Sequence, residues 1–311
     1  MKRNIWGLNL QEIETWVVEN GFPCFRAKQL RDYLYKRHIF HFDEMTQFPQ
    51  KMRDWLKENG QIDKPVIISR AQSDDEKTIK LLLKLKDGSL VETVCMCHHY
   101  GNSICVSTQV GCAMGCIFCA STRKGLERNL TAGEILAQMY AFKELYDIPF
   151  HSIVLMGAGE PLTNYEEVLH FIHLANDPEL LNISYRNITI STCGIVPQIY
   201  RLADENIPIT LAISLHAPND RIRNVLVPIS KNFRIKDVVS AAEYYFKKTK
   251  RRVTFEYILI KDMNASVENA KELCRLIGKM LCHINLIPIN GTEHIKLLSL
   301  IHISEPTRPE P

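Results

Sequence analysis

Strands and helices alternate over most of this 311-residue chain, and this alternation limits the possible folds more than any other feature. Apolar runs of strand length are separated by segments in which apolar residues recur at helical spacing. The expected strands are residues 104–107, 152–156, 187–190, 209–214, 253–259 and 284–288, and the expected helices are 132–146, 165–175, 197–203, 238–248 and 267–280. Such alternation predicts an α/β fold with a parallel sheet and crossover helices.

The residues before this alternation show a helical pattern first and a strand pattern after it. Apolar residues recur at helical spacing between residues 9 and 59, so residues 1–60 are expected to form a small helical domain. Strand patterns begin at Val66, and Asp87-Gly88 separates two of them as a hairpin turn would. We therefore expect a helical domain (1–60), a β-hairpin connector (61–100), an α/β body (101–290) and a tail (291–311).

Composition restricts the compartment. No stretch reaches the roughly 20 apolar residues that span a bilayer, and the start Met1-Lys2-Arg3 is not followed by the apolar run of a secretory signal. Ten cysteines in 311 residues are too sparse for a disulfide scaffold. A cytoplasmic protein with no membrane partner is therefore expected.

Charge alone does not indicate a nucleic-acid partner, because the net charge is only +3. Basic residues are concentrated in two runs, either of which could contact phosphate. The first run is Arg26, Lys28, Arg31, Lys36 and Arg37, and the second is Lys247, Lys248, Lys250, Arg251 and Arg252. A solvated helix face explains such runs more often than phosphate binding does.

Three cysteines, Cys112, Cys116 and Cys119, form a C-x3-C-x2-C loop. Three thiolates suit a four-iron cluster that leaves one iron open for a small-molecule chelate. Zinc is the main alternative, but structural zinc normally takes a fourth Cys or His close by. After Cys119 the next histidine is His151, beyond an expected helix. Three buried cysteines without a metal are the third alternative.

This spacing resembles the radical S-adenosylmethionine (SAM) superfamily, in which SAM chelates the open iron through its amino and carboxylate groups. Further segments resemble the RNA adenine-C2 methyltransferases that act on 23S ribosomal RNA and transfer RNA. The segments are residues 92–94, 105–112, 125–131, 156–162, 191–194, 214–217 and 285–290. Each is short, but their joint order and spacing are specific to that family.

The resemblance implies the fold, the cofactors and the partners. The fold would be a partial (β/α)6 radical SAM barrel with a small N-terminal helical domain that contacts RNA. The cofactors would be a [4Fe-4S] cluster, held by Cys112, Cys116 and Cys119, and SAM. The partners would be 23S ribosomal RNA, transfer RNA and an electron donor such as flavodoxin or ferredoxin. The matched segments fall at the carboxyl ends of the expected strands, where parallel barrels place their chemistry.

The resemblance also assigns the SAM contacts. Gly157 and Gly159 would allow close backbone approach, and Glu160 would accept a hydrogen bond from the SAM amino group. The remaining SAM contacts would be Ser191, Ser214, Leu215, His216 and Asn290. The alternatives are a tight turn with a capping glutamate, polar residues that only end strands, and a core histidine bonded to a backbone carbonyl.

Adenine carbon 2 carries a hydrogen that is not acidic, so polar methyl transfer cannot reach it. The resemblance implies that one SAM methylates a cysteine near the C-terminus and that reductive cleavage of a second SAM activates this methyl group for addition to adenine. Glu92 would be the base that removes the ring proton, and Cys105 would resolve the protein–RNA adduct by disulfide formation. The alternatives are an exposed strand carboxylate for Glu92 and a buried structural thiol for Cys105.

Other reactive residues have no expected role. The remaining cysteines are interpreted as ordinary small apolar residues: Cys24, Cys95, Cys97, Cys193, Cys274 and Cys282. His98 and His99 are not expected to share a metal ion, because adjacent strand residues point to opposite faces.

The sequence departs from the family after Asn290. The family continues with an Ala-Cys-Gly segment that supplies the methylated cysteine, whereas no cysteine follows Cys282 here. We therefore expect residues 291–311 to be a truncation artefact and the chain as given to be inactive in methyl transfer. Methylation at adenine carbon 8, or iron–sulfur RNA binding without catalysis, are the alternative functions.

Overall fold

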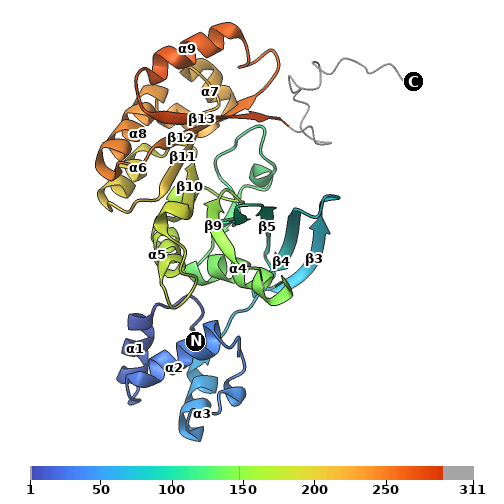
Figure 1. Cartoon of the computed structure of the whole chain (residues 1–311), viewed down its shortest axis with the longest axis vertical. Coiled ribbons are helices and arrows are strands. Elements are labelled where there is room, and N and C mark those ends of the chain that lie inside the picture. Colours follow the sequence, from blue (N-terminus) through green and yellow to red (C-terminus); the bar gives the residue numbers. More distant parts are fainter. Residues whose placement is uncertain (1, 147, 290–311) are drawn as a thin grey trace, which may run out of the picture. The chain divides into compact units, whose positions relative to one another are not determined.

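The structure, a computed structural model, describes residues 2–146 and 148–289 (Figure 1). Asn290 and the tail 291–311 lie outside the described residues. The chain divides into two compact units, which we describe separately. Unit 1 comprises Met1–Ser107, Leu130–Ser152 and Glu166–Ser184, and unit 2 comprises Thr108–Asn129, Ile153–Tyr165 and Tyr185–Pro311.

Unit 1 begins with the predicted helices α1 (Leu10–Glu19), α2 (Phe25–Tyr35) and α3 (Gln50–Asn59). The first helix starts with a capping box, in which Asn9 and Glu12 each bond the backbone N–H of the other. Strand β1 (Arg3–Asn4) pairs in parallel with β2 (Gly60–Gln61), so the two ends of the helical segment meet.

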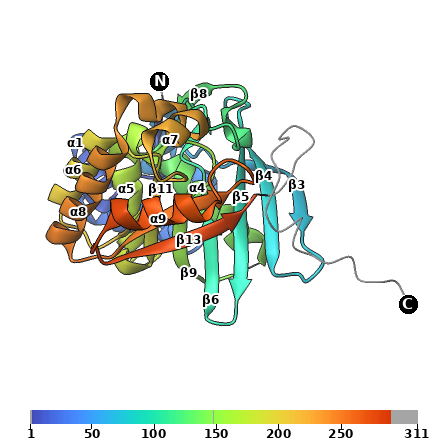
Figure 2. The same ribbon diagram turned by 90° about the horizontal axis from the view of Figure 1, so that it is seen from above.

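An antiparallel sheet follows in unit 1. Its strands β3 (Val66–Gln72), β4 (Thr78–Lys84), β5 (Leu90–His98) and β6 (Gly101–Cys105) lie side by side in chain order (Figure 2). The predicted turn at Asp87-Gly88 joins β4 to β5, and Gly88 takes the positive φ of +91° that such a turn requires. Only residues 104 and 105 of the expected strand 104–107 are in a strand: they form the end of β6, which pairs antiparallel with β5.

Two helices complete unit 1. Helix α4 (Ala132–Tyr146) has the predicted bounds, and α5 (Tyr165–Asn176) has nearly the predicted bounds. The N-terminal residues pack tightly on α4: a Cβ added to Gly133 would collide with the carbonyl oxygen of Trp6. Trp6 is buried and lies edge-on to Tyr140, with ring centroids 5.1 Å apart. The start of the chain is therefore part of the core of unit 1.

Unit 2 contains the predicted parallel sheet. Its strands are β9 (Phe150–Leu155, from Ile153), β10 (Ile188–Thr192), β11 (Thr210–Ser214), β12 (Val253–Leu259) and β13 (Cys282–Pro288), and each pairs in parallel with the next. Helices α6 (Val196–Asp204), α8 (Ile235–Thr249) and α9 (Val267–Ile277) connect them. Side chains such as Ile190, Leu211 and Phe255 are buried in its core.

Two elements of unit 2 were not predicted. A hairpin of β7 (Gln109–Gly111) and β8 (Leu126–Asn129) encloses the cysteine loop, and helix α7 (Asp220–Leu226) lies in a segment expected to be a loop. Gly111 has φ +74°, and a Cβ there would collide with the carbonyl oxygen of Gly125. In the described part of the chain no helix is long and apolar enough to cross a membrane.

Candidate functional site

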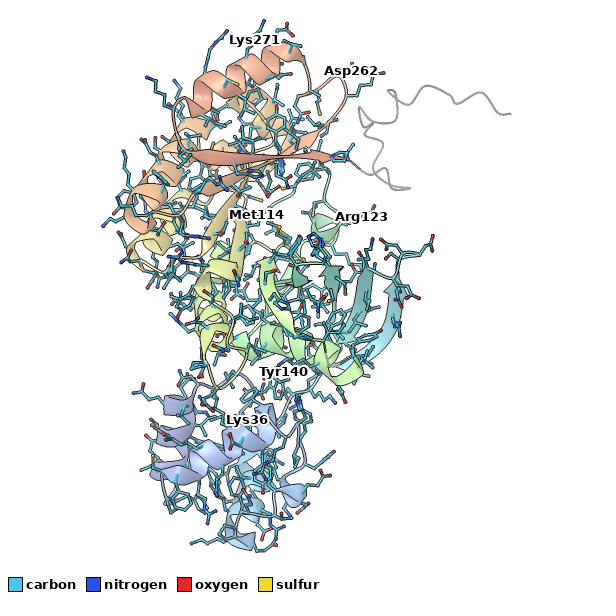
Figure 3. The ribbon with its side chains drawn as sticks, in the orientation of Figure 1. Lys36, Met114, Arg123, Tyr140, Asp262 and Lys271 are labelled. Atoms are coloured by element: carbon cyan, nitrogen blue, oxygen red, sulfur yellow. The ribbon has the colours of Figure 1, made fainter. Side chains whose placement is uncertain are left out.

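The cysteine loop is held at its first cysteine and at its centre. The backbone N–H of Cys112 donates to Gly125 O at 3.0 Å, which ties the loop to its hairpin. At the centre, the N–H of Ile117 donates to Leu226 O of α7 at 3.2 Å. Met114 lies on this loop and Arg123 lies just beyond Cys119 (Figure 3). The loop conformation therefore depends on two elements that the sequence did not predict.

The three predicted ligands, Cys112, Cys116 and Cys119, line one cavity of about 260 Å³. No three His, Cys, Asp or Glu side chains converge on a single-ion site among the residues that the structure describes. In a four-iron cluster each thiolate meets a different iron. Burial raises the pKa of the Cys112 thiol to about 11, and a bound metal would displace this proton. The donor set and its placement thus fit a four-iron cluster with one open iron.

Glu160 and Gly159 lie on the loop that follows β9 and line the same cavity. Gly159 has φ +111°, and a Cβ there would lie 2.7 Å from Cβ of Gln109, so only glycine fits. The buried Glu160 carboxylate accepts hydrogen bonds from the backbone N–H of Leu162 at 3.1 Å and of Cys193 at 2.7 Å. Burial raises the pKa of Glu160. The carboxylate therefore caps the short 3-10 helix Pro161–Asn164 and is also part of the cavity wall.

His216 is buried behind Phe118, with ring centroids 4.7 Å apart and an edge-to-face geometry. Its Nδ1 accepts the N–H of Ile258 at 3.1 Å; the expected backbone partner was a carbonyl, so that detail was wrong. Burial lowers the pKa of His216 to about 3. The ring is therefore neutral, with its proton on Nε2, because Nδ1 is an acceptor.

The remaining predicted SAM contacts belong to the same part of unit 2. Ser191 and Ser214 are half-buried at the ends of β10 and β11 and line the cavity, along with Gly157. Leu215 is fully buried and donates its N–H to Glu256 O at 3.1 Å. The structure thus brings Ser191, Ser214 and Gly157 to one cavity, whereas Leu215 does not line it; the roles of all four toward SAM stay predictions.

Three residues of this site were not predicted. Cys193 lines the cavity, and its Sγ lies 3.8 Å from Sγ of Cys116. The buried Glu256 carboxylate also lines the cavity, accepts a hydrogen bond from Asn285 Nδ2 at 2.8 Å, and has a pKa raised by burial. Arg223 of α7 is completely buried beside Cys193. Cys193 directly follows β10, and that place at the carboxyl end of a parallel strand was the available sequence signal for it. Glu256 is the central residue of β12 and had no such signal.

Glu92 and Cys105 lie in unit 1, on the neighbouring strands β5 and β6. Cys105 is directly opposite Val94, so Glu92 and Cys105 are on the same face of the sheet, as diagonal neighbours. The Glu92 carboxylate is exposed and forms an ion pair with Lys80 at 2.9 Å. In the described part of the chain no disulfide links any two cysteines.

The first basic run separates into different environments. Arg31 is buried and pairs with Asp177 at 2.8 Å, so the expectation that it contacts phosphate is wrong. Lys36 pairs with Asp32 and Glu179, whereas Lys28 and Arg37 are exposed. In the second run, Lys247 and Lys248 pair with Glu243 and Asp204, and Arg251 donates to Arg186 O and Thr210 Oγ1. The second run therefore fits a solvated protein face.

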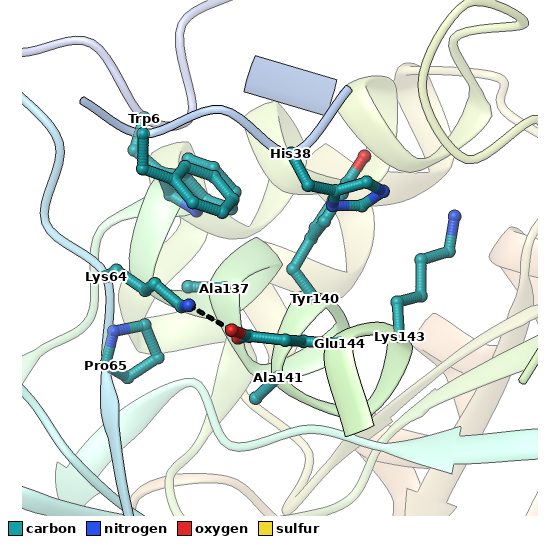
Figure 4. A pocket seen from close by; sticks show the side chains of 10 residues that line it. Trp6, His38, Lys64, Pro65, Ala137, Tyr140, Ala141, Lys143 and Glu144 are labelled. Carbon is teal, nitrogen blue, oxygen red and sulfur yellow. Dashed lines mark hydrogen bonds and ion pairs between the residues drawn. The ribbon is translucent and has the colours of Figure 1, made fainter. Parts of the chain in front are cut away.

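A second cavity, of about 340 Å³, lies in unit 1 (Figure 4). Trp6, His38 and Tyr140 form one side, and Lys64 forms an ion pair with Glu144 at 2.5 Å on the other. No cysteine lines this cavity. Since its lysine–glutamate pair is neutralised and its rings pack on one another, it does not resemble a catalytic centre.

Comparison with known proteins gives consistent results. Residues 106–274 match the Radical SAM superfamily, and residues 3–62 match the ribosomal RNA large subunit methyltransferase N-terminal domain. The chain is 49% identical to the probable dual-specificity RNA methyltransferase RlmN of Clostridium novyi, over 93% of this chain and 84% of that protein. The corresponding protein of Clostridium perfringens is 48% identical over 93% of this chain and 83% of its own length.

A solved structure is similar over nearly the whole chain. It is the crystal structure of a radical SAM methyltransferase from Sphaerobacter thermophilus, with a TM-score of 0.90 and 41% sequence identity. The match covers 95% of this chain and 88% of that protein. The similarity therefore includes both the N-terminal helical segment and the α/β body.

Proposed function

Because this chain belongs to the radical SAM superfamily and, within it, to the RlmN-type RNA methyltransferases, we propose that it methylates carbon 2 of an adenine in 23S ribosomal RNA and in transfer RNA. The cofactors of the superfamily are a [4Fe-4S] cluster and SAM. The observation that carries the proposal is the single cavity shared by three loop cysteines, Gly159 and Glu160.

The residues of unit 2 would bind the cofactors. Cys112, Cys116 and Cys119 would each ligate one iron, and the fourth iron would be left for the amino and carboxylate groups of SAM. Glu160 would orient the SAM amino group, since its carboxylate is already fixed by two backbone N–H groups. When bound, the reduced cluster supplies the electron for homolytic SAM cleavage, chemistry that can reach a carbon whose hydrogen is not acidic.

Glu92 and Cys105 would act on the adduct in which a methylene group bridges the protein sulfur and adenine, and the one unpaired electron left by radical addition would pass back to the oxidised cluster. The Glu92 carboxylate, which is exposed and lies 2.9 Å from the Lys80 ammonium, would take the proton from the ring carbon. The Cys105 thiolate would attack the sulfur that bridges protein and RNA. The sulfur–carbon bond would then break, its electron pair would stay on the methylene carbon, and a proton taken up there would complete the methyl group. An external dithiol would reduce the resulting disulfide.

The test is a product analysis with reconstituted, reduced protein, SAM and RNA. No cysteine follows Cys282 in the 311 residues, so the assay uses the chain as it stands and the chain joined to a relative's C-terminal segment with its Ala-Cys-Gly. We expect 5′-deoxyadenosine from both and 2-methyladenosine only from the joined chain, with none when that added cysteine is changed to alanine. Formation of 8-methyladenosine, or no methylated adenosine from the joined chain, would overturn the proposal.

A further inference from the structure

Arg223 is an arginine with no exposed surface, on the short helix α7. Its Nε donates to Leu215 O at 3.2 Å, and its Nη2 donates to Cys193 O at 2.6 Å and to Ser214 O at 3.4 Å. These carbonyl groups follow or end β10 and β11. One guanidinium group therefore fixes two of the loops that line the cysteine cavity.

The charge of this guanidinium has no direct counter-ion. Among the described carboxylates that of Asp220 acts on the Arg223 charge only from a distance, without a hydrogen bond, and Nη1 of Arg223 is buried without a hydrogen-bond partner. The nearby carboxylate of Asp220 accepts the backbone N–H of Ile235 at 2.7 Å instead. Burying an unpaired charge costs several kcal/mol, and arginine does not lose its proton in proteins. A buried anion is thus missing from the immediate surroundings of this cation.

The cysteine loop is the neighbour that can supply that anion. Cys193, whose carbonyl binds Arg223, has its sulfur 3.8 Å from the sulfur of Cys116. A Cβ on Gly194 would lie 3.2 Å from Nη2 of Arg223. Helix α7 itself holds the cysteine loop through Leu226 O and the Ile117 N–H. The guanidinium therefore lies on the Cys116 side of the site.

We propose that Arg223 is a positioning residue and the counter-charge of the iron–sulfur cluster, which holds the loops after β10 and β11 in place and stabilises the reduced cluster. A thiolate-bound cluster gains one negative charge on reduction, and nearby cationic charge raises the reduction potential. The inference rests on the cluster of the proposed function but not on the RNA substrate or the methylated position.

The test is a redox titration of the reconstituted full chain, followed by electron paramagnetic resonance of the reduced cluster. Arg223→Gln removes the charge and should shift the midpoint potential to more negative values, whereas Arg223→Lys keeps the charge and should shift it less. The matched control is Arg221→Gln, which removes an exposed arginine from the same helix and should leave the potential unchanged.

Citrulline in place of Arg223 separates charge from shape. This neutral residue keeps the Nε and Nη2 donors and puts oxygen where Nη1 lies, so every hydrogen bond described above can persist. We expect the negative shift of the midpoint potential without a loss of thermal stability or iron content. An unchanged midpoint potential in the citrulline protein would overturn the inference. This outcome is decisive even if Arg223→Gln fails to fold. Absence of a cluster in the unchanged chain would instead contradict the proposed function.

Discussion

The backbone N–H of Cys193 donates to Oε2 of Glu160 at 2.7 Å, which joins the loop after β9 to the loop after β10. The other oxygen of Glu160 accepts the N–H of Leu162. A buried carboxylate held in this way cannot rotate freely, so its orientation toward the cysteine cavity is set before any ligand binds. This arrangement suits a residue that must position the charged amino group of SAM.

The first prediction concerns this carboxylate. In Glu160→Gln, the new NH₂ group must face one of the two backbone N–H donors, and a buried donor without an acceptor costs about 1–3 kcal/mol. We expect a lower melting temperature and a SAM affinity reduced by roughly tenfold or more, since a charge-assisted hydrogen bond is also lost. Calorimetric unfolding and equilibrium dialysis with SAM measure the two effects.

The control for this prediction is Glu58→Gln, which changes an exposed carboxylate of α3 and should affect neither quantity. A variant that loses thermal stability but binds SAM as tightly as the unchanged chain would show that Glu160 is only a cap.

The second prediction concerns the cluster ligands. Replacing any one of Cys112, Cys116 and Cys119 by alanine leaves two thiolates for three irons, so the four-iron cluster should be lost. Iron and sulfide analysis and the charge-transfer absorption of anaerobically reconstituted protein measure this loss. Cys274→Ala, at an exposed cysteine of α9, should keep the full cluster. Stoichiometric zinc without charge-transfer absorption in the unchanged chain would falsify the cluster assignment.

Much of the fold could be predicted from the spacing of apolar residues. Each long helix or strand buries one continuous face, so its apolar residues recur at a regular interval. Helix α4 was predicted with its observed bounds, and β12 likewise. Short elements were missed. Strand β7 has three residues and α7 has seven, too few for a period to be visible. For α7 the cap Asn219, which accepts the N–H of Ile222, was the one local signal.

The residues of the candidate site that belong to a sequence motif could be predicted. The residues that reach the site only through tertiary packing could not. The cysteine spacing and the Gly159-Glu160 turn identified one side of the cavity. Arg223 was missed because an arginine on a helix is normally solvated, and nothing in its sequence neighbours indicates complete burial. Cys193 was interpreted as an ordinary apolar residue because its distance to Cys116 depends on the packing of two separate loops.

The third prediction concerns RNA binding by the N-terminal helices. Lys28 and Arg37 are exposed, so Lys28→Gln and Arg37→Gln should weaken RNA binding, and each should reduce the salt dependence of log K by about 0.7–0.9. Arg31→Gln should leave that slope unchanged and lower thermal stability instead, because it removes the partner of Asp177. Filter binding at several salt concentrations measures the slopes.

Point variants are preferable here to a deletion of residues 1–60, since Trp6 is part of the core that packs on α4. If Lys28→Gln and Arg37→Gln both leave the salt dependence of RNA binding unchanged, the helical segment is a structural cap and not an RNA contact.

The last prediction concerns pH and the contact between α1 and α5 in unit 1. Nε2 of His170 lies 3.3 Å from Oε2 of Glu12. The Glu12 carboxylate raises the pKa of His170 above its ordinary value. Burial acts to raise the pKa of Glu12, but the contacts with His170 and the Asn9 N–H outweigh it, and the pKa of Glu12 is lowered. Each group therefore favours the charged form of the other.

A raised histidine pKa stabilises the fold below the unfolded value of about 6.5, and this contribution is lost as pH rises through the folded value. The lowered pKa of Glu12 keeps the carboxylate charged throughout that range. We expect His170→Gln to lower the free energy of unfolding near pH 6 by less than about 1 kcal/mol, since the pair is partly exposed and screened, and to have a smaller effect at pH 8.5. Urea denaturation of both proteins at the two pH values measures the difference. A difference that stays constant or grows with pH would show that His170 contributes through packing and not through its charge.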